Sequence, residues 1–310
     1  MSGRLGIGLL LTALLLAGCW WALGQVHTGP VGAPFWLVIC VLLVVAWFAM
    51  DRLASISGWS RLVPIMFGAW LLFLWEVAVI GFQVPRVLLP APSAIGSVFV
   101  ASLDMLRADF VQTFVRAVIP GWVMGCGSGF LVALLIDRSP FLQRGLLPIG
   151  NLVSALPIIG VAPIMVMWFG FDWQSKAAVV VIMTFFPMLV NTTAGLTQTS
   201  AIERDLMHSY AASYWQTLLA LRLPAAMPFI FNGLKINATL ALIGALVAEF
   251  FGTPIVGMGF RISTEVGRMN LDLVWATIAV AALAGSLSYA LLAAIERMVT
   301  FWHPSYRRQR

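Results

Sequence analysis

Three ionisable side chains interrupt stretches of this chain that are otherwise apolar. Glu76 lies within residues 62–84, and Lys235 and Glu249 lie within residues 224–250. A charged group in the hydrocarbon core of a membrane is costly, so such residues face protein or water and often mark a transport pathway. Glu249 fits either a pathway or gate residue or a helix anchor. We expect Glu76 to be a structural partner near a helix end, and Lys235 to extend its ammonium group towards the membrane surface.

Signatures of catalysis and of metal binding are missing from the sequence. Its two lysines, Lys176 and Lys235, complete no Gly-x-x-x-x-Gly-Lys-[Ser/Thr] phosphate loop, so ATP hydrolysis would need a separate chain. His27, His208 and His303 have no metal-ligand spacing. We therefore predict no catalytic residue, no metal and no cofactor, and we do not expect the chain to be an enzyme.

The polar stretch 199–222 contains a repeating pattern of large side chains. Four of them recur every four residues: Ile202, Leu206, Tyr210 and Tyr214. This spacing predicts that they share one helical face. We expect a short amphipathic helix, a turn, and a second helix that leads to Pro224. Such a segment could lie on the membrane surface, or it could be a docking knob that fills a groove of a cytoplasmic partner.

The composition indicates a protein whose surrounding solvent is largely lipid. Hydrophobic residues make up 61% of the 310 residues and charged residues only 10%, against about 25% charged in an average soluble domain. The net charge of +6 comes mainly from arginines scattered between apolar stretches. This distribution indicates membrane topology and predicts no nucleic-acid partner.

Eight stretches are long enough for a transmembrane helix, which needs about 20 apolar residues. They are residues 5–26, 28–50, 62–84, 117–136, 145–171, 177–202, 224–250 and 273–295. With the N-terminus inside, eleven arginines fall on the cytoplasmic side and six basic residues on the other. The bias predicts an inner-membrane protein with both termini in the cytoplasm.

Small residues and prolines mark close helix packing and kinks. Gly121, Gly125 and Gly129 form a small-xxx-small face, which suits packing within one chain or between subunits. Pro157 and Pro163 interrupt the 145–171 helix, which predicts either a kinked helix lining a pathway or a bent core helix. Aromatic and thioether side chains follow, namely Met165, Met167, Trp168 and Phe169. They could receive a flat substrate, but we expect them to be core.

The loop resembles the coupling motif of binding-protein-dependent ABC importer permeases. That motif reads Glu-Ala-Ala, three residues, Gly, and then Leu-Pro at a fixed distance. Aligned on Leu223-Pro224, the sequence has Asp205 at the Glu position and Ala211 at the Gly position, with no gap. The family Gly permits a positive φ, which is costly for Ala211. We therefore expect a more helical turn here, or a specialised ATPase.

Further segments are similar to nitrate/sulfonate/taurine-type permeases. They are Leu89-Pro90-Ala91-Pro92-Ser93, Ala162-Pro163 with Trp168-Phe169-Gly170, Phe186-Pro187 with Asn191-Thr192, Leu223 to Pro228, and Ala248-Glu249. The resemblance covers about residues 71–302, or six of the eight predicted spans. The C-terminal stretch 248–306 looks more like the pyrimidine-precursor and riboflavin branch.

The resemblance implies an all-α permease core with the type I importer fold. It also implies a transport mechanism. Two permease copies would pack together, with a homodimer expected, a cytoplasmic ABC ATPase would dock on each coupling loop, and a periplasmic binding protein would deliver a small polar solute. Residues 1–60 would be a two-helix membrane extension, 61–302 the core, and 303–310 a cytoplasmic tail. The residues implied in ATPase coupling are Ile202, Asp205, Leu206, Tyr210, Ala211, Tyr214 and Pro224. The pathway candidates are Glu249, Pro157, Pro163, Met167 and Asn191.

Two alternatives differ in class. A stand-alone secondary transporter or channel would need no ATPase, and such proteins often show paired broken helices in two halves, a repeat that this sequence does not show clearly. A membrane enzyme is disfavoured by the missing catalytic cluster. The solute is open among pyrimidine precursors, riboflavin-like compounds, sulfonates, taurine and nitrate.

Overall fold

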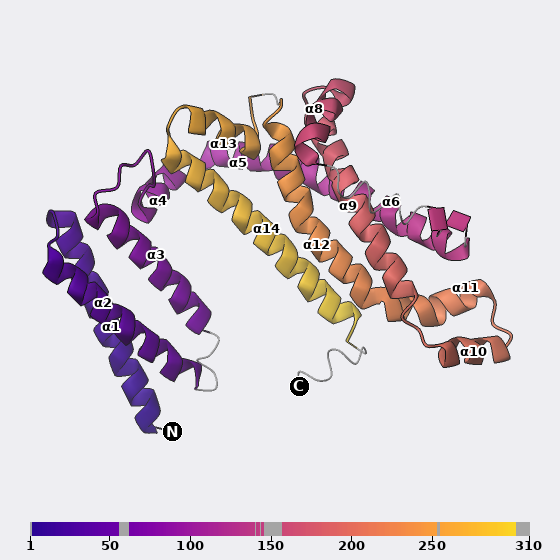
Figure 1. Ribbon diagram of the computed structural model, residues 1–310, viewed down its shortest axis with the longest axis horizontal. Coiled ribbons are helices and arrows are strands. Elements are labelled where there is room, and N and C mark those ends of the chain that lie inside the picture. The colour runs from indigo at the N-terminus through magenta and orange to yellow at the C-terminus, as the bar shows by residue number, and fades with distance from the viewer. Residues whose placement is uncertain are drawn as a thin grey trace. The chain divides into compact units, whose positions relative to one another are not determined.

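The computed structural model describes residues 2–55, 62–139, 141–142, 144–145, 157–252 and 255–301. Every regular element within these residues is a helix (Figure 1), so the all-α prediction is confirmed. The chain divides into two compact units. Unit 1 comprises Met1–Ala101 with Met269–Ala276, and unit 2 comprises Ser102–Arg268 with Thr277–Arg310.

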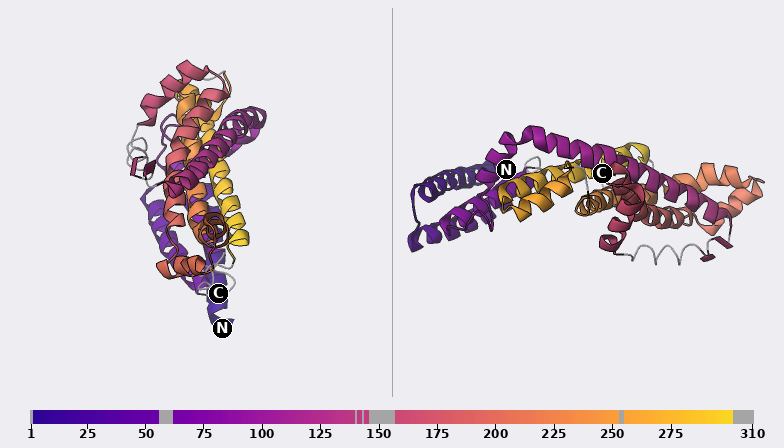
Figure 2. Two further views of the ribbon diagram at one scale, coloured as in Figure 1. Left: turned by 90° about the vertical axis from the view of Figure 1, so that its right-hand side faces the viewer. Right: turned by 90° about the horizontal axis from the view of Figure 1, so that it is seen from above.

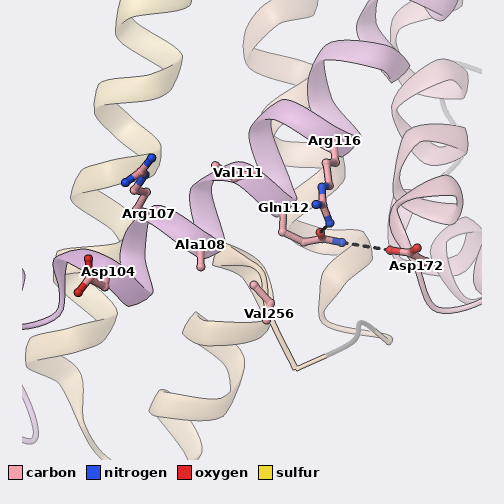
Figure 3. Close-up of a pocket in the computed structure, with 8 residues that line it drawn as sticks. All are labelled: Asp104, Arg107, Ala108, Val111, Gln112, Arg116, Asp172 and Val256. Atoms are coloured by element: carbon pink, nitrogen blue, oxygen red, sulfur yellow. Dashed lines mark hydrogen bonds between the residues drawn. The ribbon is translucent and has the colours of Figure 1, made fainter.

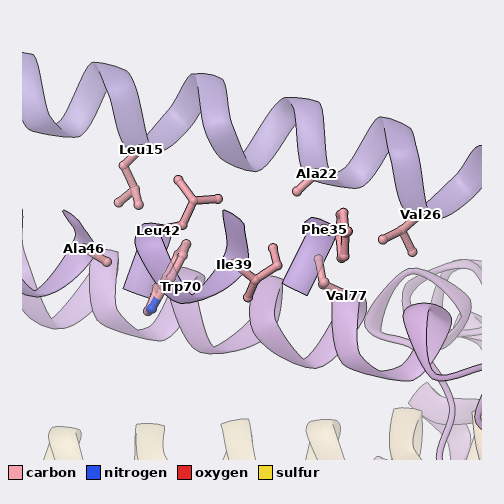
Figure 4. Close-up of a cluster of buried hydrophobic side chains, with 9 residues drawn as sticks. All are labelled: Leu15, Ala22, Val26, Phe35, Ile39, Leu42, Ala46, Trp70 and Val77. Carbon is pink, nitrogen blue, oxygen red and sulfur yellow. The ribbon is translucent and has the colours of Figure 1, made fainter. Parts of the chain in front are cut away.

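Unit 1 is built on a hairpin of α1 (Ser2–Thr28) and α2 (Ala33–Ala54), which packs with α3 (Val63–Gly81). Their shared core is apolar and comprises the nine side chains of Figure 4: Leu15, Ala22, Val26, Phe35, Ile39, Leu42, Ala46, Trp70 and Val77. Gly18 allows the close approach of α1 and α2, because a Cβ there would collide with the Leu42 side chain.

Glu76 of α3 is the structural partner that the sequence predicted. Its carboxylate accepts hydrogen bonds from the Ser93 backbone N–H at 2.9 Å and from the Ser93 hydroxyl at 2.6 Å. Ser93 lies in the first turn of α4 (Pro92–Ala101), where free N–H groups and the helix dipole favour an anion. The intramembrane charge of α3 therefore fixes the start of the next helix within unit 1.

Unit 2 contains the remaining helices. In chain order they are α5 (Leu103–Phe110), η1 (Val111–Val118), α6 (Ile119–Arg138), α8 (Ile158–Phe169), α9 (Trp173–Leu196), α10 (Ala201–Ser209), α11 (Tyr214–Thr217), η2 (Leu218–Arg222), α12 (Leu223–Glu249), α13 (Met258–Gly267), and α14 (Leu271–Val299) from Thr277 onward.

The centre of unit 2 is formed by α9, with α6 on one side and α12 on the other (Figures 1 and 2). A Cβ on Gly121 would meet Val180, and one on Gly129 would meet the Phe185 carbonyl at 2.5 Å, both on α9. The small-xxx-small face therefore packs within the chain, which was one of its two predicted uses.

Seven described helices or helix runs are long and apolar enough to cross a membrane. They are Leu10–Thr28, Ala33–Ala54, Val63–Gly81, Leu103–Arg138, Trp173–Leu196, Tyr214–Glu249 and Leu271–Val299. The predicted count of eight is not confirmed. The predicted helix 145–171 accounts for the difference, since α8 is a described helix of only 12 residues and residues 146–156 lie outside the described part.

Two of these runs are too long to lie wholly within a bilayer. Leu103–Arg138 and Tyr214–Glu249 have 36 residues each, or about 54 Å of helix against a hydrocarbon core of about 30 Å. Since α6 and α12 alone have spanning length, we expect α5 with η1 to extend beyond one membrane face and α11 beyond the other.

Each long run contains a π-helical segment just before a proline. The segment η1 ends two residues before Pro120, and η2 ends two residues before Pro224. Proline has no N–H and its ring clashes with the carbonyl four residues earlier in an α-helix. Wider i→i+5 turns relieve that clash without ending the helix, so both runs continue through their prolines.

Candidate functional site

The predicted loop helix exists as α10 and begins with a complete capping box. The Ser200 hydroxyl accepts a hydrogen bond from the Glu203 N–H, and the Glu203 carboxylate accepts from the Ser200 N–H at 2.8 Å. The Ser200 hydroxyl also donates to the Glu203 carboxylate at 2.9 Å. The bond from the Ser200 N–H, and after it the bond from the hydroxyl, hold the pKa of the Glu203 carboxyl below its usual range. A nine-residue helix thus starts at a defined position.

One face of α10 presents large side chains that are exposed. Ile202 is 80% exposed, Leu206 is 56% exposed and Tyr210, at the C-cap, is 78% exposed. Asp205 beside them is also exposed. This surface, which we call the α10 face, is the predicted amphipathic face with three of its four predicted members.

Tyr214 does not belong to the α10 face, and the prediction of a single face is wrong at this residue. The helix ends at Ser209 and a second capping box, formed by Ser213 and Gln216, starts α11 at Tyr214. The four-residue spacing continues in the sequence, but the intervening turn changes the direction of the side chain. Tyr214 instead packs against the core of unit 2.

Ala211 adopts the left-handed conformation that the sequence analysis considered costly. Its φ is 51°, its N–H donates to the His208 carbonyl, and the Ala212 N–H donates to the Met207 carbonyl at 3.0 Å. This is the Schellman pattern that usually has glycine at this position. The expectation of a more helical turn is therefore wrong: the tight turn is kept, with about 1–2 kcal/mol of conformational cost.

Beneath the turn, one carboxylate joins the ends of three helices. Asp137 near the end of α6 accepts hydrogen bonds from both terminal nitrogens of Arg222, at 2.7 and 2.6 Å, and from the Tyr214 hydroxyl at 2.8 Å. Arg222 also donates through Nε and Nη2 to the carbonyl of Leu196, the last residue of α9, at 3.1 and 3.0 Å. We call Asp137, Tyr214, Arg222 and the Leu196 carbonyl the joint.

Sequence reasoning missed Asp137. The available signal was an acidic residue at the end of an apolar span, next to the basic Arg138. A carboxylate near a helix C-terminus is disfavoured by the helix dipole and usually has a cationic partner. The sequence could suggest that a partner exists, but not that it is Arg222, 85 residues away.

Glu249 lies at the opposite end of unit 2 and is fully engaged with protein. Its carboxylate accepts from the Thr113 hydroxyl at 2.8 Å and from the Gly259 N–H at 2.7 Å. Thr113 in turn accepts from the Met258 N–H. These N–H groups belong to the first turn of α13, so Glu249 has the geometry of the anchor rather than that of the gate.

Asp109 is a second carboxylate at the same helix start. It accepts from the Gly257 N–H at 2.8 Å and from Arg261 Nε at 2.8 Å. A Cβ at Gly257 would collide with the Glu249 carboxylate, and that residue has a φ of 148°, so glycine is needed here on both counts. The two acids, with Thr113 and Arg261, hold α13 against α5, η1 and α12.

A pocket of about 550 Å³ opens at this end of the unit (Figure 3). Its lining comes from α5 and η1, the α8–α9 turn and the α12–α13 loop: Asp104, Arg107, Ala108, Val111, Gln112, Arg116, Asp172 and Val256. Arg116 donates to the Gln112 amide oxygen, and Gln112 donates to Asp172 at 3.3 Å. Among the described residues, no carboxylate forms an ion pair with Arg107 or Arg116.

The pathway candidates do not converge on one cavity. Pro157 is the N-cap of α8 and Pro163 lies inside that helix. Met167 on α8 is 82% exposed, and its neighbours Trp168 and Phe169 are 71% and 52% exposed. The expectation of core packing is therefore wrong for these three and holds for Met165, which is buried.

Asn191 belongs to a polar strip between α9 and α12. Its side-chain oxygen accepts from Asn232 at 3.2 Å, and its amide donates to the Pro187 carbonyl. The exposed face of α12 continues from Asn232 through Ile236 to Thr239. The Thr239 hydroxyl donates to the Ile236 carbonyl of its own helix, but the exposed amide of Asn232 within a spanning helix needs protein or water beside it.

Lys235 is paired across two helices. Its ammonium group lies 2.6 Å from the Glu296 carboxylate of α14, so its charge is balanced within the protein rather than by reaching the membrane surface alone. Among the described residues, no group of three His, Cys, Asp or Glu side chains could hold a metal ion.

Comparison with known proteins identifies relatives of this architecture. Residues 125–301 match the family model described as "Binding-protein-dependent transport system inner membrane component". The chain is 30% identical to the formylaminopyrimidine transport permease protein of Halalkalibacterium halodurans, in an alignment covering 79% of this chain and 97% of that protein.

Two further relatives are named for other solutes. The riboflavin transport system permease protein of Chloroflexus aurantiacus is 27% identical, over 76% of this chain and 88% of the relative. The putative aliphatic sulfonates transport permease protein of Bacillus subtilis is 27% identical, over 80% of this chain and 90% of the relative. None of the three is named as a stand-alone secondary transporter.

Proposed function

This chain belongs to the family of binding-protein-dependent transport system inner membrane components, and we propose that its α10 face is the surface gripped by a separate cytoplasmic ATPase. The chain is accordingly a multi-pass permease subunit of an ABC importer for a small solute. In this proposal the end of unit 2 that carries α10 is cytoplasmic, as are both chain termini, and residues 199–222 are the coupling loop within a core of residues 61–302.

The observation that carries the proposal is the combination of an exposed apolar face and a fixed helix. Full burial of an exposed isoleucine or leucine side chain contributes up to about 1.5–3 kcal/mol. Ile202, Leu206 and the aromatic Tyr210 are therefore suited to be the anchors of helix-in-groove recognition. A capping box at the start of α10 and a Schellman turn at its end hold the face in position before any partner binds.

A second copy of the chain is the proposed cover for the polar strip. The exposed amide of Asn232 would be costly against lipid, whereas a facing subunit or a water-filled pathway would solvate it together with its partner Asn191. We therefore place the solute pathway along this strip, which keeps Asn191 as a pathway candidate. Glu249, Pro157 and Pro163 become structural residues in this account, and Met167 with its exposed neighbours is left to lipid or the second copy.

The pocket of Figure 3 is the proposed contact for the periplasmic binding protein. It lies at the end of unit 2 opposite α10, on the part of the α5–η1–α6 run that exceeds the bilayer thickness. Arg107 and Arg116 could pair with acidic side chains of a protein surface, and Asp104 with a basic one. Such alternating charges favour one docking register.

The relatives' names point to two solute classes, flat heteroaromatic compounds and small sulfonates. We propose a solute from one of these classes. Residues 1–60 are proposed as a membrane extension of the core. The alignment with the formylaminopyrimidine transport permease protein covers 97% of that protein but only 79% of this chain, which is consistent with such an extension.

The test is uptake by the chain reconstituted in proteoliposomes with its ATPase and binding protein. We expect uptake of a radiolabelled pyrimidine precursor, riboflavin or an alkanesulfonate only when both partners and ATP are present. Uptake by the chain alone, insensitive to ATP depletion, would contradict the proposal and favour a secondary transporter.

A further inference from the structure

We infer that the joint is the transmission element of this permease: it carries movement of the coupling loop into α6 and α9. The inference rests on the proposed function and names the positioning residues Asp137, Tyr214 and Arg222. None of these residues needs to contact the ATPase, the binding protein or the solute. Their role is to move the transmembrane helices with the loop.

The geometry of the joint is that of a stiff connection. The guanidinium group of Arg222 grips the Asp137 carboxylate with two parallel bonds of 2.7 and 2.6 Å, the arrangement with the highest geometric specificity among ion pairs. The same group donates twice to the Leu196 carbonyl, an acceptor left free by the end of α9. One side chain therefore ties the helix that follows the loop to the ends of both α6 and α9.

Burial makes this connection hard to break by exchange with water. The Asp137 side chain is 8% exposed and that of Arg222 is 15% exposed. Removing one partner from a buried ion pair leaves an uncompensated charge, so the paired state is strongly favoured once formed. Exposed surface pairs, by contrast, open and close readily.

The π segment η2 explains why two residues eight positions apart reach the same carboxylate. An α-helix completes two turns in about 7.2 residues, so Tyr214 and Arg222 would lie about 80° apart around the axis of a regular helix. The wider turns of η2, which lies between them, take up the extra residue. The ring of Pro224 would clash with the carbonyl four residues earlier in a regular helix, which accounts for the wider turn. The Leu223-Pro224 pair therefore helps to position the joint.

The joint also connects directly to the turn that carries α10. Tyr214 is the first residue of α11, two residues after the Schellman turn at Ala211 and Ala212, and Arg138 lies over its ring at 5.8 Å. A force on the α10 face reaches Tyr214 through this short turn, and the hydroxyl passes it to Asp137. This assigns Tyr214 a role inside the permease.

The test compares transport with ATP hydrolysis in proteoliposomes containing the permease, its ATPase and its binding protein. The variants are Arg222→Lys, which keeps the charge but loses the fork, Asp137→Asn and Tyr214→Phe. We expect ATPase co-purification and hydrolysis to remain near wild type, while solute transported per ATP falls about tenfold for the first two, because each loses the two-bond, charge-assisted connection between Arg222 and Asp137. Tyr214→Phe should cause a smaller loss.

Matched controls separate transmission from folding. Arg268→Lys changes an arginine of the other end of unit 2 that pairs with Glu265, and it should leave the ratio unchanged. The double variant Asp137→Asn/Arg222→Lys should be little worse than either single variant, because both break one connection.

Three results are decisive. Unchanged solute per ATP in Arg222→Lys and Asp137→Asn would overturn the inference and leave the proposed function intact. Parallel loss of hydrolysis, uptake and protein abundance would also overturn it, by showing a purely structural role. Failure of the wild-type complex to couple uptake to ATP would instead refute the proposed function.

Discussion

The two ends of unit 2 use polar groups in opposite ways. At the α13 end, Glu249 and Asp109 are buried and saturated with hydrogen bonds, and they fix one short helix against three others. At the α10 end, one buried carboxylate ties helix ends together, while the helix beyond it presents Ile202, Leu206 and Tyr210 to solvent. The arrangement at the α13 end resists movement of α13. The arrangement at the α10 end leaves an exposed surface through which a partner can move the helices.

The contrast predicts that substitutions at the two ends fail differently. A change to Glu249 or Asp109 should reduce stability, and a change on the α10 face should reduce partner binding without loss of stability.

The largest expected effect is on the α10 face. Leu206→Arg would place a charge where we propose an apolar groove, and we expect ATPase affinity to fall by about 3 kcal/mol, or more than 100-fold. His208→Arg is the control, because it adds the same charge to the same helix two residues away. Co-purification and ATP-dependent uptake measure the effect, and equal losses in both variants would contradict a specific face.

A smaller effect is expected for Glu249→Gln at the α13 end. The amide loses the charge that the Thr113 hydroxyl and the Gly259 N–H bind, so we expect about 2 kcal/mol of destabilisation. Thermal unfolding in detergent should show it, while uptake per folded molecule should be unchanged. Normal stability with abolished uptake would instead make Glu249 a pathway or gate residue and remove the contrast.

The smallest effect concerns the turn between the two loop helices. Ala211→Gly keeps the Schellman hydrogen bonds but removes the cost of a positive φ, so we expect a gain of about 0.5–1 kcal/mol. Slower amide exchange at the end of α10 would measure it. Faster exchange would show that the turn in the protein is not left-handed at this residue.

The sequence predicted features that depend on neighbours along the chain. The α10 helix and three of the four predicted members of its face follow from four-residue spacing, and Glu76 has the structural role that the sequence favoured. The glycine face packs within the chain, which is one of the two uses that the sequence left open. The spans were predicted from apolar length alone. The 145–171 stretch is the exception. Helix α8 begins at Ile158, and apolar length alone does not predict that boundary.

The features that sequence reasoning missed depend on contacts between distant residues or on a change of helix phase. Tyr214 keeps the spacing of the α10 face, but a left-handed turn at Ala211 reorients it. Asp137 and Arg222 pair across 85 positions, and no local pattern specifies such a partner. Met167 looked like core because apolar residues in a membrane protein face either lipid or protein, and composition does not distinguish the two.

The most direct test of the central claim is cross-linking of the α10 face in intact cells. A Leu206→Cys variant, with Cys19, Cys40 and Cys126 replaced by serine, would be labelled with membrane-impermeant and membrane-permeant thiol reagents and then treated with a short cross-linker. We predict protection from the impermeant reagent and a cross-link to the cytoplasmic ATPase. Labelling from outside the cell, or no cross-link to an ATPase that supports uptake, would contradict it.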